Sequence, residues 1–132
     1  MGDVIISKEK AELVGAINAG GIDKMIEPLV KEIHLFDTYV AGTTHLDDQT
    51  VLDSIEEGNE LTLRREEDNR YDDNAILIFT ADKKKLGYVP EKDNLIFSRL
   101  MDAGKCLKGK IRDIEKKGSF TKISIGIYLV DF

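Results

Sequence analysis

Several features are scarce in this chain, and each absence narrows its class. Among 132 residues Cys106 is the single cysteine, so no internal disulfide can form, which fits a reducing compartment. No apolar run approaches the ~18–20 residues that a membrane-spanning helix needs. The first ten residues, MGDVIISKEK, lack the basic start and long apolar core of a secretory signal. We therefore expect a cytoplasmic protein of one compact domain.

Metal-binding and phosphate-binding patterns are also missing. The only histidines, His34 and His45, do not combine with Cys106 into any zinc spacing. The acidic stretch 66–74 lacks the central glycine and closing glutamate of an EF-hand loop. No glycine-rich phosphate loop is present. We expect no metal and no cofactor.

Two catalytic patterns compete with simpler interpretations. Cys106 with either histidine has the residue types of a nucleophile and its base, but a lone cysteine that begins a strand is typical of a small core residue. The series Asp72…Asp82-Lys83-Lys84 faintly matches metal-dependent nucleases, but residues 81–85 have the composition of a hairpin turn. The sequence therefore favours a protein that is not an enzyme.

The net charge of −6 hides an uneven distribution. Residues 1–33 carry six acids and four bases, residues 34–74 twelve and three, and residues 75–132 seven and twelve, giving −2, −9 and +5. The acidic total argues against a protein that grips a long polyanion. The positive C-terminal part predicts that one side of the fold faces an anion, or alternatively only an unevenly charged solvated surface.

The pattern changes near residue 33. Before it, Ser7 caps a predicted helix over 8–18 that ends at Gly20-Gly21, so we treat 1–32 as a helical extension. After it, short strands alternate with turns, which favours a mainly β fold, a small six-stranded barrel with two helices. The predicted strands are 33–43, 60–66, 75–80, 86–90, 106–115 and 120–130, and the predicted helices are 47–56 and 95–102, the second capped by Asn94.

Four ordered motifs carry a specific resemblance. They are Tyr39-Val-Ala-Gly42, Leu61-Thr-Leu-Arg-Arg-Glu66, Asn69-Arg-Tyr-Asp-Asp-Asn-Ala-Ile76 and Leu86-Gly-Tyr-Val-Pro90. In this order and spacing, residues 33–132 resemble a HIRAN domain. The resemblance implies a modified barrel of the OB or SH3-like type that binds single-stranded DNA at a free 3′ end. It also implies a role in DNA repair or replication-fork processing, with helicases or nucleases as partner proteins.

The resemblance assigns roles to individual residues. Tyr71 and Asp72 match the pair that surrounds the terminal 3′-hydroxyl, and a carboxylate accepts a hydrogen bond from a hydroxyl but repels a phosphate. Tyr39 and Phe120 match aromatic residues that stack on bases, a contact worth about 1–3 kcal/mol per base. We expect Tyr88 to stack as well.

The phosphate-binding positions depart from the family pattern. Thr38 stands where the eukaryotic domains carry an arginine, Tyr88 where they carry a histidine, and Glu91 where they carry a lysine, although Lys92 is adjacent. We expect Lys92 and part of a basic set to supply positive potential. That set is Lys105, Lys108, Lys110, Arg112, Lys116, Lys117 and Lys122.

The leading hypothesis is a non-catalytic module that binds single-stranded DNA at a free 3′ end. One alternative is a protein-interaction domain that kept the fold and lost affinity for DNA, as Thr38 and Glu91 suggest. A second alternative is a metal-dependent nuclease that uses the acidic loop around Asp72. The charge distribution predicts a short binding footprint with a shallow salt dependence.

Overall fold

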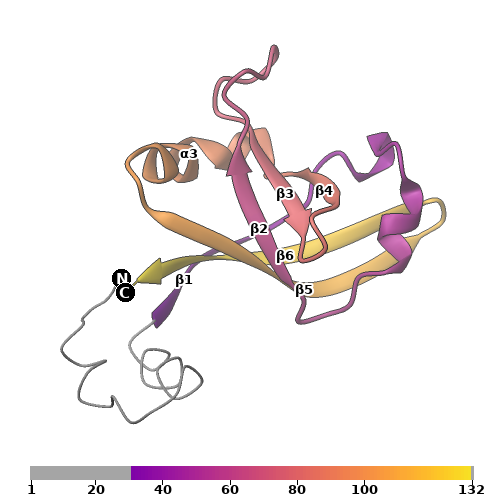
Figure 1. The fold of residues 1–132 in the computed structure, drawn as a ribbon. Coiled ribbons are helices and arrows are strands. Elements are labelled where there is room, and N and C mark those ends of the chain that lie inside the picture. The colour runs from indigo at the N-terminus through magenta and orange to yellow at the C-terminus, as the bar shows by residue number, and fades with distance from the viewer. Residues whose placement is uncertain (1–30, 132) are drawn as a thin grey trace, which may run out of the picture. The chain divides into compact units, whose positions relative to one another are not determined.

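The computed structural model describes residues 31–131, so the predicted N-terminal helix over 8–18 lies outside the described residues. The unit over Glu32–Val130 contains a six-stranded sheet in the order β1-β6-β5-β2-β3-β4 (Figure 1). The strands are β1 (Lys31–Tyr39), β2 (Glu60–Arg65), β3 (Ile76–Thr80), β4 (Lys85–Tyr88), β5 (Cys106–Lys117) and β6 (Phe120–Asp131). The helical elements are the 3₁₀ turns η2 (Thr43–His45), η3 (Gln49–Asp53) and η4 (Glu91–Asp93), and the α-helix α3 (Asn94–Asp102).

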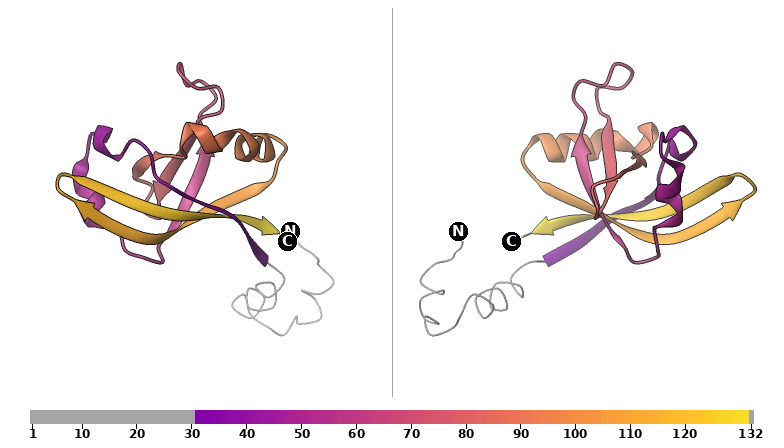
Figure 2. Two further views of the ribbon diagram at one scale, coloured as in Figure 1. Left: turned by 180° about the vertical axis from the view of Figure 1, so that it is seen from behind. Right: turned by 45° about the vertical axis from the view of Figure 1, so that its right-hand side comes forward.

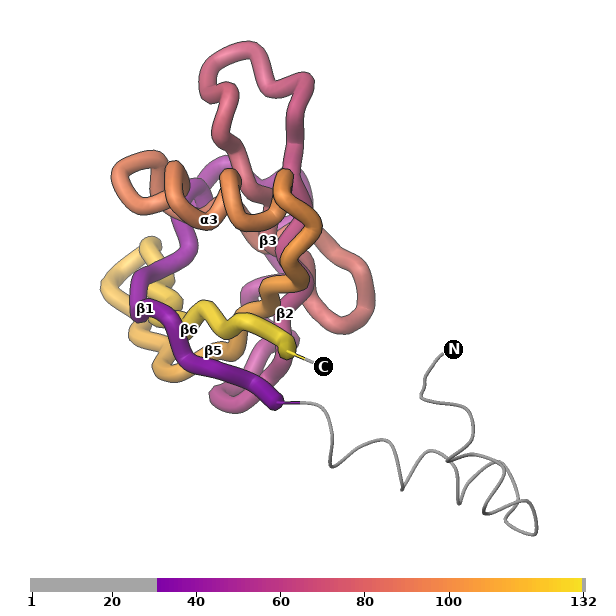
Figure 3. Tube along the Cα trace, turned by 90° about the vertical axis from the view of Figure 1, so that its left-hand side faces the viewer, coloured from indigo at the N-terminus to yellow at the C-terminus, as the bar shows by residue number. Residues whose placement is uncertain are grey.

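The sheet is antiparallel and curled rather than the closed barrel that the sequence predicted. An isolated bridge joins the residues after the edge strand β1 to the other edge strand, β4: Ala41 N donates to Tyr88 O at 2.8 Å and Tyr88 N donates to Ala41 O at 2.9 Å. Figure 3 shows the labelled strands following the curl, with α3 across its open side. This bridge brings the residues after β1 next to β4, so it positions both for the site described below.

Alternating apolar residues explain the inner face of the curl. Ile123, Ile125 and Ile127 of β6 are fully buried, as their period of two predicted. In β2, Leu61 and Leu63 are buried between exposed neighbours. The core cluster also contains residues of β3, β4, β5 and α3, namely Ile76, Ile78, Leu86, Leu107, Ile111 and Phe97. No helix within residues 31–131 is long and apolar enough to cross a membrane.

The predicted helix over 47–56 is wrong, because the segment forms only the five-residue 3₁₀ turn η3. Asp48 accepts a hydrogen bond from Thr50 N at 3.0 Å, and Ser54 Oγ bonds back to Val51 O at 2.9 Å, which ends the turn. Val51 and Ile55 are nevertheless buried. The described residues therefore contain one α-helix where the sequence predicted two.

The final hairpin is the longest feature of the sheet, and Figure 2 shows β5 and β6 extending beside the 3₁₀ turns. The two strands pair from Cys106↔Val130 to Lys117↔Phe120, with a bulge between Ile111 and Asp113. Cys106 is exposed, so the expectation of a small core residue is wrong. The register directs the next residue, Leu107, into the core instead.

Candidate nucleic-acid interface

The loop 66–75 projects from the ends of β2 and β3, and its neck is closed by hydrogen bonds (Figure 1). Glu66 N donates to Ala75 O at 3.0 Å across the neck. The guanidinium of Arg65 donates to Ala75 O at 2.6 Å and to Asp73 O at 2.9 Å, and its Nε donates to Asp102 at 2.9 Å. Arg65 thereby fixes the returning half of the loop against α3.

Inside the loop, Asn69 organises the backbone. Its Oδ1 accepts from Tyr71 N at 2.8 Å and from Asp72 N at 2.9 Å, while its Nδ2 donates to Glu66 Oε1 at 2.7 Å. Asn69 therefore forms a turn by bonding the backbone two and three residues further on. The side chain of Tyr71 is 89% exposed, so its ring is held on an ordered backbone and faces solvent.

The Asp72 carboxylate is held in place by two donors. Its Oδ1 accepts from Asn74 N at 2.9 Å, and its Oδ2 accepts from Asn94 Nδ2 at 2.8 Å. Because an ionised carboxylate only accepts hydrogen bonds, the NH₂ side of the amide is the side that faces it. Asp72 is half-buried, and each oxygen keeps acceptor capacity for a ligand.

Asn94 therefore has a different role from the predicted helix cap. The N-cap residue of α3 is Asp93, which makes no side-chain capping bond. Asn94 is 1% exposed, and its side-chain amide donates a hydrogen bond to Asp72, which is 22 residues earlier in the chain. Periodicity and capping rules relate residues that are a few positions apart, so they do not predict this contact.

Three consecutive residues connect β1 to the loop. Lys92 Nζ lies 5.6 Å from the centre of the Tyr39 ring, and Asp93 Oδ2 accepts from Thr38 Oγ1 at 2.8 Å. The next residue holds Asp72. The segment Lys92–Asn94 thus contacts both Tyr39 and Asp72, which are far apart in the sequence.

A cleft of about 510 Å³ opens beside Tyr39. It is bounded by the end of β1, the turn η4 and the strands β5 and β6. Its lining consists of Phe36, Asp37, Thr38, Tyr39, Lys92, Asp93, Arg112, Asp113, Lys122, Ser124 and Ile125. Its volume is within the range of small-molecule sites. Two aromatic rings and three basic side chains therefore border the same cleft, together with three carboxylates.

Tyr88 is placed differently from Tyr39. Its hydroxyl donates to Glu66 Oε1 at 2.8 Å, and Lys85 Nζ lies 4.8 Å from its ring centre. Burial, the hydrogen bond to Glu66 and the charge of that carboxylate raise the pKa of Tyr88 to about 12. Hydrogen bonds from Asn69 and Tyr88 lower the pKa of Glu66. Tyr88 thus ties β4 to the neck of the loop.

Replacing Glu66 by glutamine is expected to lower the pKa of Tyr88, because the negative charge beside the phenol is removed. The folded pKa of about 12 lies above the usual value of about 10. The stability that this pair contributes is therefore present below pH about 10 and lost as the pH rises toward 12. The loss should be smaller in Glu66→Gln. Tyrosinate absorbance against pH measures the shift, and Tyr88→Phe identifies the titrating group.

Phe120 lies at the tip of the final hairpin, paired with Lys117, and is 40% exposed. The following residue, Thr121, accepts a hydrogen bond through its carbonyl from Thr43 Oγ1 at 3.4 Å, which places the tip beside η2. Phe120 is not part of the cleft lining. Of the six predicted site residues, Tyr39 and Lys92 share the cleft and Tyr71 and Asp72 share the loop. Tyr88 contacts the neck of the loop, through Glu66, and Phe120 lies outside both the cleft and the loop.

The positive C-terminal part of the sequence does not form an unbroken basic face. Lys108 and Lys110 both pair with Glu32, the second at 2.7 Å, and Lys108 also pairs with Glu60 at 3.0 Å. Lys116 Nζ lies 3.6 Å from Asp53. The acidic partners come from three elements that the fold brings near β5, since Glu32 lies in β1, Glu60 in β2 and Asp53 in η3. Much of the charge imbalance along the sequence is cancelled in space.

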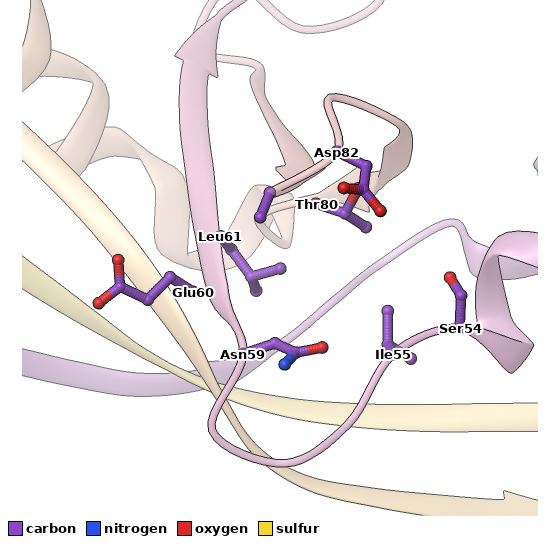
Figure 4. Close-up of a pocket in the computed structure, with 8 residues that line it drawn as sticks. Ser54, Ile55, Asn59, Glu60, Leu61, Thr80 and Asp82 are labelled. Atoms are coloured by element: carbon purple, nitrogen blue, oxygen red, sulfur yellow. The ribbon is translucent and has the colours of Figure 1, made fainter.

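A second pocket, of about 190 Å³, lies between the segment before β2 and the end of β3. It has no basic or aromatic lining residue, and Figure 4 shows its two carboxylates, Glu60 and Asp82, on opposite sides. Within residues 31–131, no group of three or more His, Cys, Asp or Glu side chains is arranged to hold a metal ion.

Comparison with known proteins agrees with the fold. A protein from Lactobacillus plantarum, solved by the Northeast Structural Genomics Consortium, is 28% identical, with a TM-score of 0.72 over 78% of this chain and 99% of its own. The HIRAN domain of human HLTF is 16% identical, with a TM-score of 0.61 over 75% of this chain and 78% of its own, and shares the fold. No curated protein matches the sequence. The HIRAN domain model matches residues 33–130, about three quarters of the sequence, and the chain therefore belongs to the HIRAN domain family.

Proposed function

We propose that residues 33–132 form a non-catalytic module that binds single-stranded DNA and prefers a free 3′-hydroxyl end, in repair or replication-fork processing. Family membership supports this proposal. The observation that carries it is the segment Lys92–Asn94, which contacts Tyr39 and fixes Asp72. A stacking surface and a hydroxyl acceptor are thereby held by one rigid connection.

The chemistry of the loop suits a terminal hydroxyl. Asp72 has acceptor capacity on both oxygens, and its charge repels a terminal phosphate. The exposed ring of Tyr71 stands beside it on the loop. We infer that these two residues enclose the 3′ end, with Tyr71 packing against the last sugar.

The cleft suits the bases and backbone that precede the end. Tyr39 offers a ring face for stacking, and Lys92 lies close enough to that ring to contact a phosphate beside a stacked base. Phe120, exposed at the hairpin tip, provides a second stacking surface in this proposal. Tyr88 contributes by holding Glu66 and the loop neck rather than by stacking. Helicases or nucleases that act at such ends are the expected partner proteins.

Fluorescence anisotropy with labelled oligonucleotides that end in a 3′-hydroxyl or a 3′-phosphate tests the proposal. We expect the hydroxyl form to bind at least about tenfold more tightly, equivalent to about 1.4 kcal/mol. Equal affinities would remove the end preference. Absence of binding would favour the alternative, a protein-interaction module. Cleavage of DNA in magnesium or manganese that Asp72→Ala abolishes would instead show a nuclease.

A further inference from the structure

The cleft beside Tyr39 contains two basic side chains that come from the final hairpin. Arg112 extends from β5 and Lys122 from β6, and both line the cleft together with Tyr39 and Lys92. The cleft that is proposed to hold the nucleotides before the 3′ end therefore extends onto the final hairpin.

These two cations retain free hydrogen-bond donors. Arg112 uses one nitrogen, 3.4 Å from the Tyr128 hydroxyl and 3.7 Å from Asp37, and its side chain is 51% exposed. A guanidinium has five N–H donors, so most remain available. Lys122 makes no side-chain hydrogen bond or ion pair with any of residues 31–131. By contrast, Lys108 is bound to two carboxylates.

Two of the three lining carboxylates already have partners. Asp93 accepts from Thr38 and pairs with Lys92 at 3.0 Å, and Asp37 pairs with His34 at 2.7 Å. The third, Asp113, is exposed and has no cation within pairing distance among the described residues. The three basic and three acidic side chains of the lining balance in formal charge, but Arg112 and Lys122 keep unused donors that suit an anion with several acceptor oxygens.

We propose that Arg112 and Lys122 form a subsite for the backbone phosphates of the nucleotides that precede the 3′ end. The inference rests on the proposed function and extends it: the substrate is a single-stranded 3′ tail of several nucleotides rather than an isolated terminal nucleotide. The planar fork of Arg112 provides paired contacts to phosphate oxygens, and Lys122 adds a point charge.

The test measures binding of 3′-hydroxyl oligothymidines of about three and about ten nucleotides, lengths at and above the few bases that a small fold contacts. The double variant Arg112→Gln, Lys122→Gln should bind the longer oligonucleotide about fivefold more weakly. Its log–log salt slope should be smaller by about 1.4, since each phosphate contact on a single strand contributes about 0.7. The affinity of the double variant for the shorter oligonucleotide should fall less, and its preference for a 3′-hydroxyl should persist. Asp113→Asn should strengthen binding of the longer one.

The double variant Lys105→Gln, Lys116→Gln is the matched control, because it also removes two positive charges from the C-terminal part of the chain but outside the cleft. Thermal unfolding of every variant separates a folding defect from a lost contact. If the wild-type protein binds and the double variant keeps its affinity and salt slope, the phosphate subsite is wrong while the proposed function stands. If the wild-type protein binds no oligonucleotide, both are overturned.

Discussion

Asp72→Asn is expected to abolish the preference for a 3′-hydroxyl end. Asparagine keeps the shape of the side chain, but its single amide oxygen can accept from Asn94 or from Asn74 N and not from both, and the charge that repels a phosphate is gone. A hydrogen bond to a charged group is worth about 1.5–3 kcal/mol, so the ratio of the two affinities should fall by about tenfold to a hundredfold. Anisotropy titrations of both oligonucleotides measure this ratio.

Asp73→Asn is the control for this prediction. Asp73 is the next residue and exposed, and its interaction with Arg65 is made by the backbone carbonyl, which the substitution leaves in place. It removes the same charge one position away and should preserve the preference. Equal losses in the two variants would mean that the general field of the loop, and not a contact of Asp72, sets the preference.

Gly87→Ala is expected to cause the largest loss of stability. A Cβ at this position would lie 2.4 Å from Ala41 O and 2.5 Å from Val40 Cγ1, so the backbone of one strand must move. That movement strains the bridge between Ala41 and Tyr88 that joins the edges of the curl. Overpacking of a buried site costs about 1–3 kcal/mol and sometimes more. The midpoint of thermal unfolding should therefore fall by about 10 °C or more.

Gly118→Asn provides the comparison. Gly118 has φ of +63° in the hairpin turn, a Cβ there meets nothing within 4 Å, and asparagine tolerates this conformation. Its midpoint should change little. A Gly87→Ala protein as stable as the wild type would contradict the view that the close approach of β4 to residues 40–41 fixes the curl.

Elements set by local patterns were predictable from the sequence. The buried isoleucines of β6 and the alternating leucines of β2 indicated strands in the correct places, because a period of two has one interpretation when one face is buried. The helix predicted over 47–56 was wrong because its apolar spacing is compatible with more than one structure. Val51 and Ile55 have helical spacing, yet only Val51 lies in the short 3₁₀ turn, and Ile55 is buried from the segment that follows it.

Features set by distant contacts were not predictable in the same way. The bridge between Ala41 and Tyr88, and the bond between Asn94 and Asp72, join residues separated by tens of positions. The pairing of Lys108 with Glu32 and Glu60 likewise depends on which strands are neighbours. The resemblance to HIRAN domains supplied the loop residues of the candidate site, while Asn94 emerged only from the packing of α3 against the loop.

The turn η4 and the first residue of α3 have a consequence for chain length. Lys92, Asp93 and Asn94 contact Tyr39, Thr38 and Asp72 in turn. Their order along the chain is therefore as important as their identity. Inserting or deleting a single residue here would rotate the following positions and separate all three from their partners together. The turn 81–84 joins β3 to β4 without such contacts to the loop or the cleft. Natural length variation in this fold should therefore accumulate in that turn and be excluded from residues 91–94.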